Sequence, residues 1–143
     1  MNTESGTSPA APNAAGGAVA LATTLGEVRQ ALGAEIVWCP DLTAPVTGIV
    51  AADLMSDVLV DARPGYVLVT GLVNVQVIRT AAIADLAAVV FARGKTVPPD
   101  VIDLARQMNV PAFASHDTLF EAAGRLYAVF GGTPAGPAAR RQA

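Results

Sequence analysis

The chain has 143 residues, of which 52% are hydrophobic and 15% charged, and its formal net charge is −3. This length is enough for one domain with a buried core, and the composition is too apolar for a disordered protein. The mild negative charge argues against general nucleic-acid affinity, and no apolar run reaches the roughly 18–20 residues that a membrane span needs.

The single cysteine, Cys39, excludes an intrachain disulfide and any site with several cysteine ligands. It ends an apolar run without a nearby basic residue, which favours an inert thiol over a nucleophile. No Lys or Arg precedes Arg29, so the basic start of a secretory signal is missing. We therefore expect a cytoplasmic protein. Abundant arginine, alanine and valine beside one lysine indicate a bacterial genome rich in G and C.

The expected domain occupies residues 22–130. Residues 1–21 are rich in Ala, Gly, Ser, Thr and Pro without a sustained period, which is typical of a disordered leader. Residues 131–143 have a similar composition and are expected to form a flexible tail.

The first elements are a helix and two apolar runs. Thr24 and Glu27 form a capping box that starts a helix over 24–33, and Gly33 is a typical stop. Strand-like runs follow at 34–39 and 46–51. The six residues between these runs are too few for a helical crossover, so their pairing is either antiparallel or absent.

From residue 46 onward, short apolar runs alternate with amphipathic segments. The expected strands are 46–51, 66–70, 87–92 and 110–115, and the expected helices are 53–62, 75–86, 100–109 and 117–130. Asp53 is expected to cap the first of these helices. Short strands that are apolar throughout are typical of a parallel sheet buried on both faces. We therefore predict a single α/β domain with a small, mostly parallel sheet flanked by helices, in which 66–70, 87–92 and 110–115 are adjacent.

The tripeptide Gly94-Lys95-Thr96 resembles the end of a phosphate-binding P-loop. In a P-loop the first glycine would fall at position 89, which is Val89, and the loop would occupy the most strand-like stretch of the chain. Val97-Pro98-Pro99 also separates Thr96 from the next helix. The pattern therefore excludes a P-loop. Arg93 and Lys95 either form a solvated turn or contact an anion just beyond a strand's carboxyl end.

The carboxyl ends of parallel strands gather at one edge of a sheet, and helix N-termini there favour phosphate or carboxylate groups. The same residues could equally cap their helices and bind nothing specific. The candidate ligand-binding residues at this edge are Asp53, Thr70, Gly71, Asn74, Arg93, Gly94, Lys95, Ser115, His116 and Asp117.

Two pairs offer other chemistry. Asp53 and Asp57, four residues apart, either face a divalent cation or serve as a cap and a solvated partner. His116 and Asp117 either form an acid–base pair or belong to a helix entry in which Thr118 and Glu121 make a capping box. We assign no catalytic residue, metal or cofactor.

Four stretches occur in an order that resembles the DRTGG domain family. They are "TLGEVRQALGAEIV", "VTGIVAADLMSDVL", "YVLVTG" followed by "AAVVFARG", and "IDLARQMNVPAFASHDTLFEAAGRL". Together they cover about residues 24–130, and the last is the most specific. The acidic and basic residues that name the family are absent after Gly71, where the chain has Leu72, Val73 and Asn74.

The resemblance implies a module similar to the N-terminal domain of the HPr kinase/phosphorylase, without its kinase domain. DRTGG domains also occur in phosphotransacetylases and in CBS-containing pyrophosphatases, where they are associated with regulatory adenine-nucleotide binding. The leading hypothesis is a non-catalytic regulatory domain that binds a small anion, for which an adenine nucleotide is one candidate. The alternatives are an adaptor for a partner enzyme, associated with a hydrogenase or a phosphorelay, and a small enzyme of unknown reaction. The apolar, charge-poor composition also predicts a homodimer.

Overall fold

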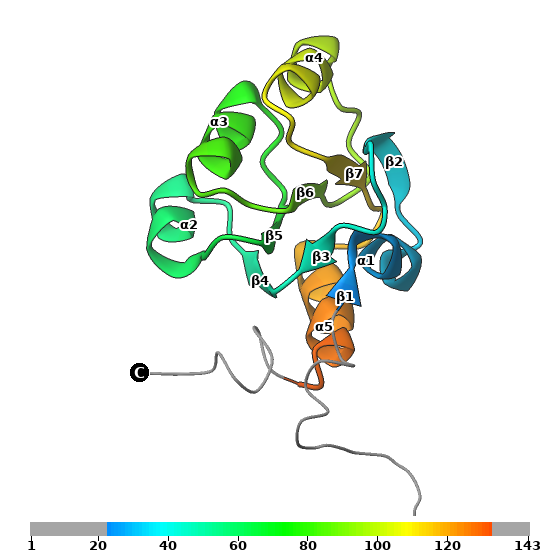
Figure 1. Ribbon diagram of the computed structural model, residues 1–143. Coiled ribbons are helices and arrows are strands. Elements are labelled where there is room, and N and C mark those ends of the chain that lie inside the picture. The colour runs from blue at the N-terminus through cyan, green and yellow to red at the C-terminus, as the bar shows by residue number, and fades with distance from the viewer. Residues whose placement is uncertain (1–22, 133–143) are drawn as a thin grey trace, which may run out of the picture.

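The computed structural model describes residues 23–132 (Figure 1). The expected leader over 1–21 and nearly all of the expected tail lie outside these residues. Within them, no helix is both long enough and apolar enough to cross a membrane.

A five-stranded sheet in the order β2-β7-β6-β5-β4 forms the centre of the domain. The strands β4 (Gly48–Ala51), β5 (Tyr66–Thr70), β6 (Ala88–Phe91) and β7 (Ala112–Ala114) are parallel neighbours. The predicted adjacency of the three central strands is therefore confirmed. The short strand β2 (Glu35–Trp38) joins the sheet antiparallel to β7, at the edge opposite β4. The two runs that follow the first helix in sequence consequently do not pair.

Helices cover both faces of this sheet (Figure 1). One face carries α2 (Met55–Asp61), α3 (Val75–Ile83) and α4 (Pro99–Gln107), and the other carries α1 (Leu25–Leu32) and α5 (Leu119–Val129). The α/β class predicted from the sequence is thus confirmed. The helices α2, α3 and α4 are the successive crossovers between the parallel strands. The carboxyl ends of β4 to β7 therefore all lie at the same edge of the sheet.

The central strands are buried on both faces, as their unbroken apolar runs predict. In β5, Val67 and Val69 pack toward α1 and α5, whereas Leu68 packs toward the three crossover helices. In β6, Val90 packs toward α1 and α5, and Phe91 packs toward the three crossover helices. Side chains of a strand alternate between faces, so a strand that fills two cores is apolar along nearly its whole length.

The N-terminal segment adds a small second sheet, in which β1 (Thr23–Thr24) pairs antiparallel with β3 (Pro45–Val46). The apolar run over 46–51 is therefore divided between two sheets. The capping box of Thr24 and Glu27 is present, and Gly33 ends α1 in the left-handed conformation, with φ of 58°. Both features agree with the sequence.

The C-terminal helix α5 begins with the predicted second capping box. The Thr118 hydroxyl accepts from the Glu121 backbone N–H at 3.1 Å, and the Thr118 backbone N–H donates to the Glu121 carboxylate at 2.9 Å. This backbone donor holds the pKa of Glu121 below its ordinary value. Thr118 and Glu121 therefore belong to the helix start and not to a catalytic group.

Gly48, at the start of β4, is required by a close contact with β5. A Cβ atom at this position would lie 2.5 Å from Cε1 of the Tyr66 ring, which is buried. We expect Gly48→Ala to lower the free energy of unfolding by about 1–3 kcal/mol, as overpacking of a core does. Urea denaturation would measure the change. The loss should shrink in a Tyr66→Leu background, and equal losses in both backgrounds would contradict this explanation.

Candidate functional site

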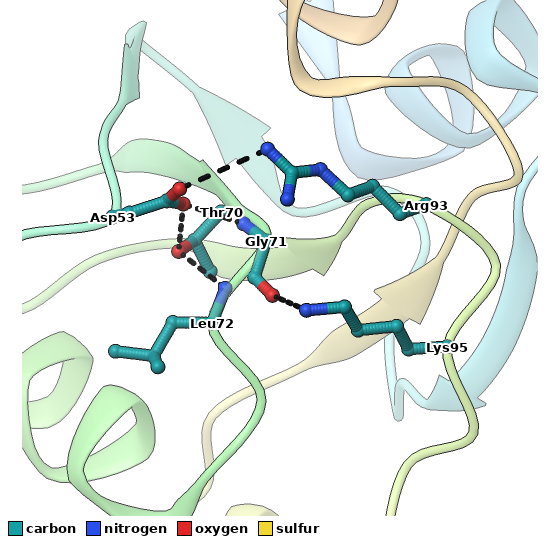
Figure 2. A network of polar contacts seen from close by, with 6 residues as sticks. All are labelled: Asp53, Thr70, Gly71, Leu72, Arg93 and Lys95. Carbon is teal, nitrogen blue, oxygen red and sulfur yellow. Dashed lines mark hydrogen bonds and ion pairs between the residues drawn. The ribbon is translucent and has the colours of Figure 1, made fainter.

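Asp53 follows β4 and ties its end to the neighbouring strand. Its Oδ1 atom accepts from the Gly71 backbone N–H at 2.8 Å and from the Thr70 hydroxyl at 3.2 Å (Figure 2). The prediction that Asp53 caps α2 is wrong, because that helix begins only at Met55 and its N-cap, Leu54, makes no side-chain bond. The two-residue delay leaves Asp53 in the loop, where its carboxylate satisfies polar groups of β5.

The end of β5 is a turn in which every polar group near Asp53 has a partner. Thr70 is fully buried, and its hydroxyl also accepts from the Leu72 backbone N–H at 3.1 Å. Gly71 then passes beneath the Arg93 side chain, since a Cβ at Gly71 would lie 3.2 Å from Arg93 Cζ. Any larger residue at position 71 would displace the guanidinium group.

The loop after β6 has two consecutive left-handed residues, Arg93 with φ of 73° and Gly94 with φ of 65°. Their backbone N–H groups donate to the carbonyls of Asp117 at 2.7 Å and of Ser115 at 2.8 Å. These two bonds attach the β6 loop to the β7 loop. The left-handed region costs an L-residue such as arginine roughly 1–2 kcal/mol, whereas glycine adopts it freely.

Two cationic side chains of this loop lie on the Thr70-Gly71 turn (Figure 2). The Lys95 ammonium donates to the Gly71 carbonyl at 2.5 Å, and Arg93 Nη2 lies 3.9 Å from Asp53 Oδ2. Arg93 and Asp53 are about half exposed, at 48% and 49%, so this long ion pair contributes little to stability. The segment is therefore an exposed loop whose Lys95 side chain folds back onto the end of β5.

The loop after β7 is held by a hydrogen bond within the loop and by an ion pair with α5. Ser115 is buried, and its hydroxyl accepts from the Asp117 backbone N–H at 3.1 Å. His116 is exposed and lies over Gly94, where a Cβ would come 2.7 Å from the imidazole Nδ1. Asp117 Oδ2 lies 3.1 Å from Arg125 Nε. The two groups form an ion pair, but their geometry is not that of a hydrogen bond. Asp117 is thus engaged by Arg125, and the acid–base hypothesis for His116 and Asp117 gains no support.

Asn74 has a local role apart from these loops. Its side-chain oxygen accepts from the Val77 backbone N–H at 3.2 Å and caps α3. Because Asn74 caps α3 and Thr118 caps α5, two of the four helix N-termini expected to attract an anion already have a side-chain acceptor. The positive charge of this edge comes mainly from Arg93 and Lys95.

The P-loop comparison fails in the structure as it does in the sequence. The stretch before Gly94-Lys95-Thr96 includes β6, which is completely buried, so its backbone amides are committed to the sheet. The next helix, α4, starts at Pro99, and Val97 and Pro98 separate it from Thr96.

Other candidate chemistry is weak within residues 23–132. They contain no group of three or more His, Cys, Asp and Glu side chains that could hold a metal ion. Cys39 is half-buried, and this burial raises the pKa of its thiol. An open depression of about 650 Å³ lies on α1 around Glu27 and Arg29.

No protein-family model matches the chain, and no curated protein sequence matches it. Among solved structures, it is similar to the CBS and DRTGG domains of the regulatory region of Clostridium perfringens pyrophosphatase, complexed with the activator diadenosine tetraphosphate. The TM-score is 0.65 at 17% sequence identity, over 82% of this chain. The chain spans about half of that structure, at 50% of its length. At this identity the likeness shows the fold.

The left-handed backbone of Arg93 gives a test of why arginine occupies this position. We expect Arg93→Gly to be more stable than Arg93→Ala by about 1 kcal/mol, because both variants lose the guanidinium and only glycine relieves the backbone. Thermal and urea unfolding of the two variants would measure the difference. Equal stabilities would show that the left-handed conformation is not retained in solution.

Proposed function

We propose that the protein is a non-catalytic regulatory module of the DRTGG type, working in the cytoplasm, that binds a small anion at the carboxyl edge of its sheet. An adenine nucleotide is the candidate ligand. The ordered sequence resemblance supports the family, and the fold likeness to a regulatory region crystallised with a nucleotide activator supports the class of function.

One observation carries the proposal: Arg93 and Lys95 converge on the same turn, and within residues 23–132 Asp53 is the one carboxylate with which either of them forms an ion pair. This leaves one unit of positive charge in excess, in a chain whose net charge is −3. The Lys95 ammonium has a neutral carbonyl as its partner, and Arg93 makes a long, exposed ion pair. A phosphate group would give both cations a charged partner in exchange for one long ion pair and one hydrogen bond to a neutral carbonyl.

The side chains differ in what they can offer a phosphate. Arg93 supplies a planar fork suited to two phosphate oxygens, and Lys95 supplies a mobile point charge. His116 is exposed above Gly94 in the adjoining loop, where it adds a further hydrogen-bond donor. Asp53, Thr70 and Gly71 hold the turn on which the cations rest, and Ser115 and Asp117 hold the loop beneath His116. Asn74 is left out of this proposed site.

The double variant Arg93→Ala/Lys95→Ala tests the site. Titration calorimetry with ATP, diadenosine tetraphosphate and tripolyphosphate should show binding by the wild type that weakens about 10-fold or more in the variant. Each lost charge-assisted bond is worth about 1.5–3 kcal/mol. The affinity of the wild type should also fall as salt rises. Stability should change by no more than about 1 kcal/mol, since both side chains are exposed.

Two single variants serve as controls. Arg106→Ala removes an equally exposed arginine on α4, which pairs with Asp103, and should leave affinity unchanged. Thr96→Ala should also have no effect, because without a P-loop its hydroxyl has no magnesium ion to hold. No binding of any of the three probes by the wild type would overturn the proposal. Steady nucleotide hydrolysis that Thr96→Ala abolishes would overturn its non-catalytic part.

A further inference from the structure

A second surface lies on the other side of the domain from the crossover helices, between β4 and α5. Ile49 and Ala51 of the strand line an open groove of about 320 Å³, together with Phe120, Ala123, Gly124 and Tyr127 of the helix. None of these side chains is charged, and three of them are small. The groove is therefore an apolar hollow with room for one bulky side chain.

Phe120 forms one wall of this hollow and is 87% exposed. It lies in the first turn of α5, one helical turn before Gly124, on the same face of the helix. An exposed phenylalanine ring gains nothing from water, and its burial would be favourable. The same face of the molecule thus presents a large apolar knob next to an apolar hole.

Gly124 supplies an independent indication that something approaches this groove. It lies in the interior of α5, where glycine is a poorer helix former than alanine. A Cβ atom at Gly124 would meet nothing within 4 Å. No contact among the described residues therefore requires a glycine here, whereas a ring packing closely against the helix would.

The adjacent sheet edge is also open to a second chain. β4 is the last strand of the sheet, and its four residues include no charged residue and no proline. Charges and prolines are the usual devices that prevent edge-to-edge association. On the other side of β4, Leu54 is exposed at 61%, so apolar side chains flank this edge on both faces.

We propose that a second copy of this chain covers the groove, with Phe120 of each copy inserted into the groove of the other about a two-fold axis. A symmetric dimer needs one surface that is complementary to itself, and a knob beside a hole on one face meets that need. An unrelated partner would explain the hole but not the neighbouring knob. The uncharged lining lets two negatively charged copies approach without local like-charge repulsion.

The size of this surface predicts a weak dimer. Two phenylalanine side chains bury about 300–500 Å² between them, and the groove walls bury a similar area in return. The total of about 600–1,000 Å² lies below the roughly 1,200 Å² at which stable interfaces start. We therefore expect dimers at tens of micromolar and dissociation on dilution.

Sedimentation of the full-length chain over a range of concentrations tests the proposal with two unlike variants. Phe120→Glu removes the knob, and Gly124→Leu fills the hole; each should raise the dimer dissociation constant by more than about 10-fold. Gly124→Leu should leave the thermal midpoint unchanged or raise it, because leucine is the better helix former and open space surrounds the position. A monomeric Gly124→Leu protein is therefore not explained by misfolding.

Ile83→Glu is the matched control, since Ile83 is similarly exposed, at 74%, on α3. This variant should dimerise as the wild type does. A wild type that stays monomeric into the hundreds of micromolar would overturn the proposal, as would a dimer that persists in both groove variants. A monomeric wild type that loses thermal stability on Phe120→Glu would show that Phe120 packs within its own chain, and would overturn the proposal as well.

Discussion

The arrangement of the strand ends depends on the contacts that side chains make with the Thr70-Gly71 turn. The Asp53 carboxylate accepts from the Thr70 hydroxyl and the Gly71 backbone N–H, and the Lys95 ammonium donates to the Gly71 carbonyl. Three successive strands are thereby fixed to one another beyond the last hydrogen bonds of the sheet. The absence of a side chain at Gly71 lets the Arg93 guanidinium lie against the backbone, so the turn supports both cations.

The contacts of this network differ in length and in exposure. The bonds made by Asp53 Oδ1 are short and partly buried, whereas the Arg93 contact to Oδ2 is long and exposed. Arg93 can therefore change partners with little effect on the turn, whereas Lys95 would give up its hydrogen bond to the Gly71 carbonyl to reach a ligand.

The fold could be read from the sequence to a large extent, since it depends on local patterns. The unbroken apolar runs of β5 and β6 and the capping boxes at Thr24 and Thr118 are determined by neighbouring residues, and all are present. The position of β2 could not be read, because a strand's partner is chosen by contacts distant in sequence. The same holds for Asp53. Its residue type fits a helix cap, but in the fold its carboxylate bonds to the end of β5 and not to the start of α2.

The sequence predicted which edge of the sheet holds the candidate site, but it did not predict most of the contacts within it. Strand order alone placed Asp53, Thr70, Arg93 and His116 at one edge, but the backward fold of Lys95 onto Gly71 has no local signal. A second example concerns the acidic and basic residues that the family resemblance led us to look for after Gly71, where the chain has neither. Asp53 and Arg93 meet beside Gly71 from two different loops, a pairing that no inspection of consecutive residues would reveal.

The left-handed geometry at Arg93 and Gly94 restricts how this edge can recognise anything. The backbone N–H groups of both residues donate to carbonyls of the β7 loop, so neither amide is available to a phosphate as it would be in a nest. Arg93 can therefore contact a ligand only through its side chain, and Gly94 has no side chain to offer. Under the proposed function, Arg93 and Lys95 would favour ligands that carry more phosphate groups, and selectivity for an adenine base would have to come from other residues at this edge.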